Sequence, residues 1–324
     1  MSSLKTKNTI NQVAVCSRSF SRHPYLRSVL LSKFEHVKFN DDGLSLADES
    51  LVEFLLRADF AITGLETIDD YILSNLPQLK RISKYGVGLD MIDIEAMRRH
   101  GKELAWQGGV NRRSVAELAL TMMLSIIRKI PESQSKIASG LWIQTVGNTL
   151  TEKTVGIIGC GNIGRDLVAL LKPFKCRILI NDIQDYHDYY RSNDLEDHSL
   201  ESLLTNSDVV TLHVPLDEST RNIISKERLS LMKPNSILIN TARGGLIDEK
   251  ALVAALKDKK IFGAGLDVFA VEPPFQNELL SCPTVFPTAH IGGSAEEAII
   301  AMGMSAIDGL VDNHAQLVSK ESFF

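Results

Sequence analysis

The sequence predicts an α/β protein with two doubly wound parallel sheets, and three features of its 324 residues support this fold class. Apolar, strand-like runs alternate with amphipathic, helix-like segments along most of the chain, which favours parallel sheets covered on both faces with right-handed crossovers. A glycine-rich turn lies between a strand and a helix near the middle of the chain. The length is more than one hydrophobic core usually serves, so two domains are expected.

The first hundred residues predict one of these sheets. Its expected strands are 13–16, 37–39, 60–63, 79–83 and 104–106, and its expected helices are 24–34, 51–55, 68–76 and 92–100. This βαβ alternation carries no glycine fingerprint, so we do not expect this region to hold the cofactor.

A long apolar helix is expected next, over residues 114–130, with Pro131 ending it. Its apolar residues surround more than one face of the helix: Val115, Leu118, Leu120, Met122, Met123, Ile126 and Ile127. Such a helix is usually buried on two sides, here between domains or between subunits. Since isologous dimers are the commonest assembly, we expect a homodimer.

Residues 154–182 have the features of a dinucleotide-binding unit. A short apolar strand leads into Gly159, Gly161 and Gly164 with G-x-G-x-x-G spacing, and an amphipathic helix follows. These glycines allow a tight turn, a close approach of the pyrophosphate and close packing of helix on strand, while the helix N-terminus attracts phosphate. Asp182 ends the second strand, where a carboxylate would bind the adenosine ribose. The alternative is a glycine-rich turn in some other α/β protein.

The residues that follow Asp182 favour NAD over NADP. Ile183, Gln184 and Asp185 include no Arg or Lys that could bind a 2′-phosphate.

Three short motifs that follow later predicted strands contain residue types common in catalytic sites. Arg243 follows the strand 237–240, Glu272 follows the strand 264–268, and His290 stands in the sequence PTAHIGG. Ligands of open α/β sheets bind at the carboxyl ends of strands. Hydride transfer to a 2-oxo acid needs a cation for the carboxylate, an acid for the forming alkoxide, and a group that keeps this acid charged. Taken singly, the three residues could equally be a turn cap, a solvated acid and a loop histidine.

The ordered motifs KYGVGLDMID, NRRSVAELAL, VGIIGCGNIG, HVPLDEST, NTARGGLIDE, GLDVFAVEPP and TAHIGG make the sequence similar to a known family, over about residues 55–300. The chain resembles the D-isomer-specific 2-hydroxyacid dehydrogenases, which include phosphoglycerate, glycerate and D-lactate dehydrogenases. The resemblance implies an NAD-dependent dehydrogenase of a small 2-hydroxy or 2-oxo acid. It also implies a Rossmann cofactor domain (106–292) inserted in a flavodoxin-like substrate domain (1–105 and 293–324), with the active site in the cleft between them.

The resemblance also implies roles for individual residues. Arg243 would bind the substrate carboxylate and polarise the carbonyl, His290 would exchange the proton, and Glu272 would orient His290 and favour its protonated form. The backbone at Val87 and Gly88, with Tyr85 beside it, would bind substrate. The cofactor would be lined by Gly159, Gly161, Asn162, Ile163, Gly164, Asp182, Val214, Thr241, Ala242, Asp267, Gly292 and Gly293, with Asp267 near the nicotinamide amide.

The chain departs from the family pattern at Met91, where Asn is usual, and at Lys84-Tyr85, so the substrate pocket can be unusual. The chain ends soon after the last predicted helix (295–311), so we expect no appended regulatory domain. An alternative in another class is an NAD-sensing corepressor of the same fold, but the long flanks rich in Pro and Ser that would favour it are absent. Formate-type dehydrogenases of the family carry Gln where this chain has Glu272, so the carboxylate favours alcohol–carbonyl chemistry.

Composition excludes several other classes. A formal charge of −5 argues against nucleic-acid and anionic-membrane partners. The polar N-terminus has no apolar segment typical of a signal peptide, so a cytoplasmic location is expected. The four cysteines are scattered without metal-ligand spacing, so no metal site is predicted.

The segment Ser17-Arg18-Ser19-Phe20-Ser21-Arg22-His23 is a second candidate anion site. It is expected as a loop at the ligand edge of the substrate domain, where two arginines could hold a distal phosphate or carboxylate, as in 3-phosphohydroxypyruvate. The alternative is a solvated basic loop that caps the next helix at Ser21 or Pro24.

Overall fold

The computed structural model describes residues 11–311, which form two compact units. One unit comprises the described residues up to Asn111 together with those from Glu296 onward, and the other runs from Arg112 to Ala295. The predicted domain boundaries, 105/106 and 292/293, lie a few residues before these divisions. Residues 1–10 and 312–324, which the sequence analysis assigned to the substrate domain, lie outside the described residues.

The first unit is built on a parallel sheet, which among the described residues has five strands in the order β2-β1-β3-β4-β5. This order is that of flavodoxin-like sheets. The strands are β1 (Gln12–Val15), β2 (His36–Phe39), β3 (Phe60–Thr63), β4 (Arg81–Lys84) and β5 (Glu103–Ala105). The helices are α1 (Arg18–Arg22), α2 (Pro24–Lys33), α3 (Asp48–Leu55), α4 (Asp70–Ser74), α5 (Ile94–Arg99) and α13 (Glu296–Val311).

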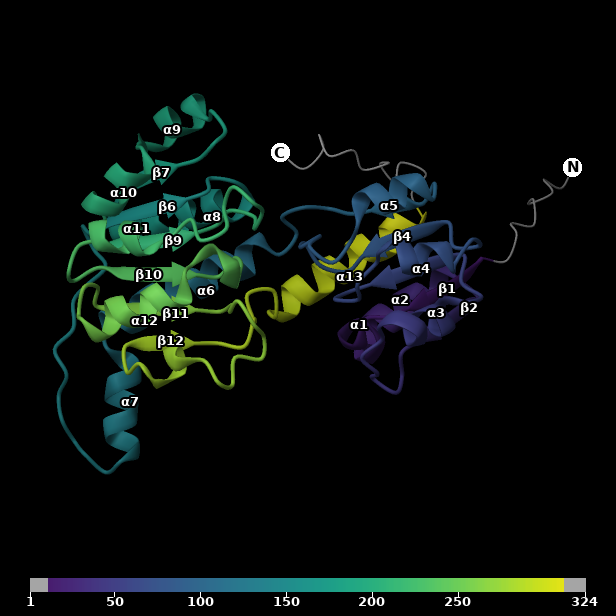
Figure 1. Cartoon of the computed structure of the whole chain (residues 1–324), viewed down its shortest axis with the longest axis horizontal. Coiled ribbons are helices and arrows are strands. Elements are labelled where there is room, and N and C mark those ends of the chain that lie inside the picture. Colours follow the sequence, from purple (N-terminus) through teal and green to yellow (C-terminus); the bar gives the residue numbers. More distant parts are fainter. Residues whose placement is uncertain (1–10, 312–324) are drawn as a thin grey trace, which may run out of the picture. The chain divides into compact units, whose positions relative to one another are not determined.

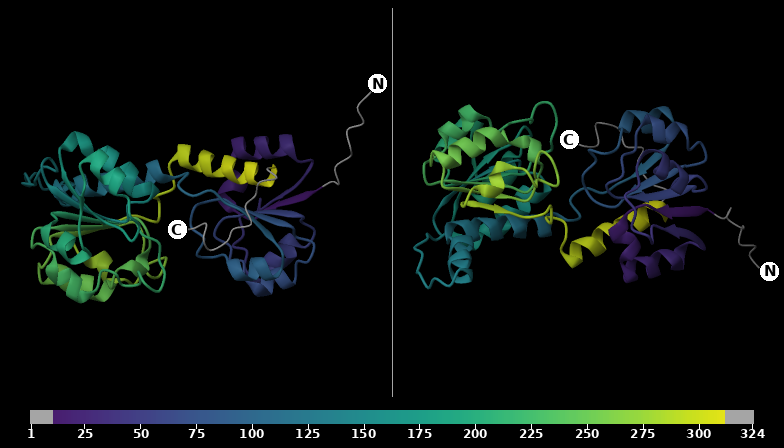
Figure 2. Two further views of the ribbon diagram at one scale, coloured as in Figure 1. Left: turned by 90° about the horizontal axis from the view of Figure 1, so that it is seen from above. Right: turned by 60° about the horizontal axis from the view of Figure 1, so that its bottom comes forward.

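Helices cover both faces of this sheet (Figures 1 and 2), and each face has its own hydrophobic core. The last helix, α13, returns to the unit in which the chain begins. Gly303 of α13 packs directly on the side chain of Leu26, and the hydroxyl of Ser83 donates to the carbonyl of Ala306 at 2.7 Å. The two parts of the chain therefore form one folded body.

The second unit contains a parallel sheet, with seven strands among the described residues in the order β12-β11-β10-β9-β6-β7-β8. The six strands from β11 to β8 have the order of a dinucleotide-binding sheet, and β12 extends its edge. The strands are β6 (Thr154–Ile158), β7 (Arg177–Asn181), β8 (Glu196–Asp197), β9 (Val209–Leu212), β10 (Ile237–Asn240), β11 (Gly263–Leu266) and β12 (Val285–Pro287). The predicted fold class of two parallel sheets is thus confirmed.

The helices of the second unit lie on both faces of its sheet (Figure 2). They are α6 (Arg112–Ile127), α7 (Ile130–Ala138), α8 (Asn162–Leu171), α9 (His187–Asn193), α10 (Leu200–Asn206), α11 (Lys226–Leu231) and α12 (Glu249–Lys257), with the short 3₁₀ turns η1 (Lys172–Phe174), η2 (Gly244–Leu246) and η3 (Glu278–Ser281). Within residues 11–311, none of the helices combines the length and the apolar character that a bilayer span requires.

The long apolar helix differs from its prediction in two ways. First, α6 ends at Ile127, and Pro131 opens the next helix, α7, because proline is well accommodated in a first helical turn. Second, the apolar residues of α6 are covered within its own unit, where Met122, Met123 and Ile126 share a core with β6 and α8. The composition of α6 therefore needs no second domain or subunit to explain it.

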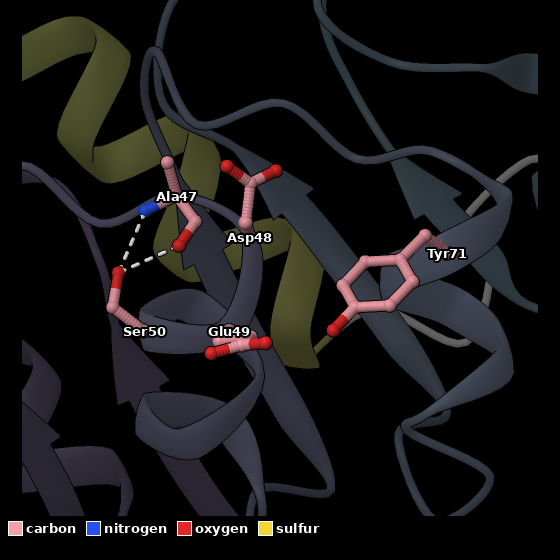
Figure 3. Close-up of a pocket in the computed structure, with 5 residues that line it drawn as sticks. All are labelled: Ala47, Asp48, Glu49, Ser50 and Tyr71. Atoms are coloured by element: carbon pink, nitrogen blue, oxygen red, sulfur yellow. Dashed lines mark hydrogen bonds between the residues drawn. The ribbon is translucent and has the colours of Figure 1, made fainter.

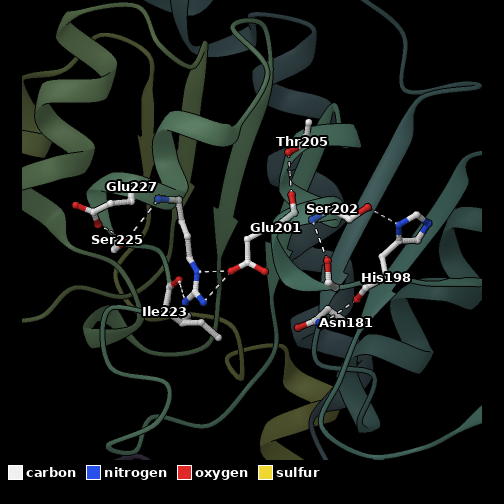
Figure 4. A network of polar contacts seen from close by, with 10 residues as sticks. Asn181, His198, Glu201, Ser202, Thr205, Ile223, Ser225 and Glu227 are labelled. Carbon is white, nitrogen blue, oxygen red and sulfur yellow. Dashed lines mark hydrogen bonds and ion pairs between the residues drawn. The ribbon is translucent and has the colours of Figure 1, made fainter.

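A polar network supports the end of β7, where the predicted ribose acid Asp182 leaves the sheet (Figure 4). The amide of Asn181 donates to the carbonyl of His198 at 2.9 Å, and the His198 ring contacts the hydroxyl of Ser202 on α10 at 2.9 Å. Next to it, the guanidinium of Arg228 on α11 donates to the carboxylate of Glu201. These contacts join β7, α10 and α11 around one edge of the sheet.

Candidate active site

The predicted site residues of the second unit follow strands that are neighbours in the sheet. His290, Glu272 and Arg243 come after β12, β11 and β10, in that order across the sheet. Farther along the same edge of the sheet lie Val214 after β9, the glycine turn after β6 and Asp182 after β7. Because all these strands are parallel, their carboxyl ends share one edge, which is where ligands of such sheets bind.

The three glycines of the turn meet different surroundings. Gly159 has a φ of +96°, and a Cβ there would lie 2.6 Å from the carbonyl oxygen of His213. A Cβ on Gly164 would overlap the carbonyl oxygen of Gly159, so helix α8 packs directly on the turn. A Cβ on Gly161 would meet no atom within 4 Å. The fold therefore requires Gly159 and Gly164, while Gly161 leaves open space at the N-terminus of α8, as a bound phosphate needs.

Asp182 is already joined to this turn. Its carboxylate accepts hydrogen bonds from the backbone N–H groups of Cys160 at 2.6 Å and Gln184 at 2.8 Å. The nearby Arg165 donates to the carbonyl of Cys160, and its guanidinium stacks on the rings of Tyr186 and Tyr189. The acid and the glycine turn thus form one preassembled unit.

Two buried polar atoms on this edge have no hydrogen-bond partner among the described residues. They are Nδ1 of His213, after β9, and Oγ1 of Thr241, after β10. Burial lowers the pKa of His213 to about 3, so its imidazole is neutral at neutral pH. Buried polar atoms without partners cost free energy, which a polar ligand can recover. Together with the open position at Gly161 and the placement of Asp182, these atoms fit a bound dinucleotide.

His290 and Glu272 form a pair. Nδ1 of His290 lies 2.9 Å from Oε2 of Glu272, and Oε1 of Glu272 accepts a hydrogen bond from the N–H of Phe269 at 3.0 Å. The side chains are 47% and 37% exposed. The carboxylate engages one ring nitrogen, Nδ1, so the other ring nitrogen, Nε2, is the one available to a ligand.

A buried carboxylate holds the turn that presents His290. Asp267, 1% exposed, accepts hydrogen bonds from the hydroxyl of Thr288 and from the N–H groups of Ile291 and Gly292, both at 2.8 Å. The N–H of His290 donates to the carbonyl of Asp267 at 2.8 Å. Its oxygens thus hold the turn of His290, and a contact of Asp267 with a nicotinamide amide stays a prediction.

Arg243 lies on a turn that is fixed by the buried Asn240. The Asn240 amide donates to the carbonyl of Arg243 at 2.8 Å, and its oxygen accepts from the N–H of Ala242 at 3.0 Å. A Cβ on Gly244 would overlap the backbone of Phe269. The turn that carries Arg243 therefore packs directly against the loop that carries Glu272.

The substrate-binding residues predicted in the first unit lie at the end of β4. The ammonium of Lys84 donates to the carbonyls of Gly64 at 2.6 Å and Tyr85 at 3.2 Å, and the indole of Trp106 donates to the carbonyl of Val87 at 2.8 Å. Within residues 11–311, the N–H groups of Val87 and Gly88 donate to no other residue. They are suitably placed at a strand end to receive a carboxylate.

Tyr85, by contrast, is a core residue. It is 7% exposed, and its ring packs edge-on against Phe20 with 5.6 Å between centroids. Desolvation by this burial raises the pKa of its phenol. This role was not predicted, because a tyrosine between a strand and two nearby glycines (Gly86 and Gly88) carries no local sign of burial.

The predicted basic loop is a short helix, α1, and most of its polar groups serve the fold. Ser17 caps the N-H of Phe20, Ser21 donates to the carbonyl of Val15, and His23 caps α2. Arg18 and Arg22 are exposed on the helix surface. The alternative interpretation expected Ser21 or Pro24 to cap the next helix, but the cap of α2 is His23, and Pro24 lies in its first turn. An anion site at the two arginines stays a prediction.

A hollow on the surface of the first unit contains none of the predicted site residues. It is lined by Ala47, Asp48, Glu49, Ser50 and Tyr71 (Figure 3). Its charged side chains are both carboxylates, which would repel an anionic substrate. The hollow is therefore poorly suited to an anionic ligand.

Comparison with known proteins places these features in a family. Residues 120–292 match the description "D-isomer specific 2-hydroxyacid dehydrogenase, NAD binding domain". The chain is 35% identical to glyoxylate reductase of Thermococcus litoralis over 285 residues, which cover 83% of this chain and 84% of that protein. It is 40% identical to D-3-phosphoglycerate dehydrogenase of Methanocaldococcus jannaschii over 268 residues, but spans only 50% of that protein. The solved structure of a glyoxylate reductase from Paecilomyes thermophila superposes with a TM-score of 0.82 at 27% identity, covering 94% of this chain and 95% of that one.

The two glycines that differ in their surroundings give a first prediction. Gly161→Ala should leave the melting temperature nearly unchanged and weaken NADH binding by about tenfold or more, because the methyl group enters the space for phosphate. Gly164→Ala should lower the melting temperature, because its Cβ overlaps the backbone of Gly159. Calorimetry and NADH fluorescence titration measure both effects. Unaltered NADH affinity in Gly161→Ala would contradict the assignment of this turn.

Proposed function

Because the chain belongs to the D-isomer specific 2-hydroxyacid dehydrogenase family, we propose that Arg243, Glu272 and His290 are its catalytic residues. Membership of this family makes the protein an oxidoreductase that has an NAD-binding domain and acts on the CH–OH group of 2-hydroxy acids. The second unit, which contains the matched residues 120–292, is the cofactor domain, and we assign substrate binding to the first unit.

The roles of the three residues follow from their chemistry. NADH, when bound, supplies the hydride for reduction of a 2-oxo acid. The guanidinium of Arg243 binds the substrate carboxylate and polarises the adjacent carbonyl. Nε2 of His290 gives its proton to the carbonyl oxygen as it becomes a hydroxyl, and takes it back in the reverse reaction. Glu272 holds Nδ1 of His290 at 2.9 Å and stabilises the charged imidazolium.

The observation that carries this proposal is the His290–Glu272 contact. A carboxylate on one ring nitrogen of a half-exposed imidazole is an arrangement that suits a general acid. Within the first unit, the N–H groups of Val87 and Gly88 are proposed to bind the substrate carboxylate as well. Because the Thermococcus relative that the chain matches along most of its length is a glyoxylate reductase, we propose a short 2-oxo acid of the glyoxylate class as substrate.

A screen of 2-oxo acids with NADH and NADPH tests the class of substrate and the choice of cofactor. We expect the highest kcat/KM with glyoxylate or hydroxypyruvate and NADH, with NADPH at least about tenfold poorer, because Asp182 repels a 2′-phosphate and Arg165 is engaged by two tyrosines. Loss of absorbance at the nicotinamide band is the readout. A preference for 3-phosphohydroxypyruvate that Arg18→Ala and Arg22→Ala abolish would replace this substrate with a dianionic one.

The pH dependence of reduction tests the pair. Reduction requires protonated His290, and a carboxylate at its Nδ1 favours that form, so Glu272→Gln should move the alkaline limb of kcat/KM to lower pH. His290→Ala should lose on the order of a hundredfold in rate, the usual contribution of a general acid. An identical alkaline limb in Glu272→Gln would rule out the proposed role of the carboxylate.

We further propose a homodimer, in which α7 and the segment after it form the contact. This part of the second unit extends away from its sheet (Figure 1) and carries large exposed apolar side chains. They are Ile137, Leu141, Trp142, Ile143 and Val146, and Trp142 is 88% exposed. Clusters of exposed apolar residues of this kind mark protein interfaces.

Replacement of the central aromatic residue tests this interface. The parent protein should scatter light as a species of about twice its chain mass of 35.8 kDa, and Trp142→Glu should shift it toward the monomer because a charge then lies in an apolar contact. Leu31→Glu, on the exposed surface of α2, is the matched control and should leave the mass unchanged. A parent protein of about 36 kDa at micromolar concentration would refute the dimer.

A further inference from the structure

The loop that carries Glu272 is anchored at both ends by one side chain. Glu249, the first residue of α12, accepts a hydrogen bond on Oε1 from the N–H of Ala270 at 2.7 Å. Its Oε2 accepts one from the amide of Asn277, also at 2.7 Å. Asn277 is itself fixed, since its N–H donates to the carbonyl of Pro274 and its side-chain oxygen caps η3 through the N–H of Leu279.

Hydrophobic burial contributes little to holding this loop in place. Between the two anchors, Val271 is 74% exposed and Phe275 is 85% exposed, so these side chains remove little apolar surface from water. The segment has neither helix nor strand before η3. Its conformation therefore depends on polar contacts, of which those to Glu249 span the two ends.

We propose that Glu249 is a positioning residue, whose carboxylate holds the 270–277 loop so that Glu272 meets Nδ1 of His290. This inference rests on the proposed catalytic pair. The N–H of Ala270 and the amide of Asn277 donate to the two oxygens of one carboxylate. Position 249 therefore needs two acceptor oxygens on a side chain as long as that of glutamate. A glutamine would offer one acceptor and present its NH₂ group to the Asn277 amide, whose own oxygen already accepts from Leu279.

An acidic residue in the first turn of α12 also stabilises the helix through its dipole. That role uses neither the Ala270 contact nor the Asn277 contact, and an aspartate would fill it equally well. Shortening the side chain at constant charge therefore distinguishes the loop-positioning role, which needs the length of glutamate, from the helix-dipole role, which needs only the charge.

Three variants of the purified full chain test the proposal through the alkaline limb of kcat/KM for reduction. Glu249→Gln should move this limb to lower pH, toward that of Glu272→Gln, because Glu272 is no longer held at His290. Glu249→Asp, which keeps the charge but is one methylene shorter, should move it in the same direction. Glu249→Gln combined with Asn277→Asp should restore the limb, because the glutamine NH₂ then donates to the new carboxylate.

Glu278→Gln is the matched control. It removes one negative charge from η3, where Glu278 is 71% exposed and pairs with Lys257, and it should leave the limb unchanged. Two results would overturn the positioning role. The alkaline limb of Glu249→Asp could coincide with that of the parent protein, or Glu278→Gln could move the limb as far as Glu249→Gln does. Either result would mean that only the negative charge matters. If Glu272→Gln itself leaves the limb in place, the proposed pair fails first, and the two failures are therefore distinguishable. If Glu249→Gln does not fold, Glu249→Asp and the double variant decide the matter.

Discussion

The parallel direction of the seven described strands in the second unit is the constraint on which the site depends. Parallel pairing sends every crossover back over a face of the sheet, so the carboxyl ends of all the strands meet on one edge. Arg243, Glu272 and His290 are far from each other and from the glycine turn in sequence, yet they follow strands of this single sheet. A chain with antiparallel strands would have divided the same motifs between two edges.

At that edge, the proposed catalytic residues lie on loops and not on strands, and each loop is held by a polar side chain that accepts backbone N–H groups. Asn240 fixes the turn of Arg243, Asp267 fixes the turn of His290, and Glu249 spans the loop of Glu272. Loops expose much of their apolar surface, so hydrophobic burial does little to hold them. A carboxylate that accepts two or three N–H groups gives a defined geometry instead, and charged acceptors make such bonds stronger than neutral ones.

Two histidines that follow strands of this sheet have different surroundings. His213 is buried and kept neutral by desolvation, whereas His290 is half exposed beside a carboxylate. The imidazole after β9 is therefore neutral at neutral pH, whereas the imidazole after β12 is held at Nδ1 by a carboxylate. The first unit is built by the same logic, since Lys84 and Trp106 bind carbonyls near β4 and leave the N–H groups of Val87 and Gly88 at the strand end.

The two parallel sheets, the strands 60–63 and 237–240 to the residue, and the motifs that follow the strands could be predicted from the sequence, because apolar periodicity and glycine spacing are local properties of the chain. The remaining features depend on tertiary contacts. Strands β8 and β12 are too short to show a period, and Pro131 opens a helix instead of ending one. Tyr85 is buried by Phe20, and α6 is covered by α8 within its own unit. Glu249 meets Asn277 across 28 positions of the chain. Local sequence patterns predict that a surface is buried or that the chain turns. Which element packs on that surface depends on contacts between residues that are distant in sequence.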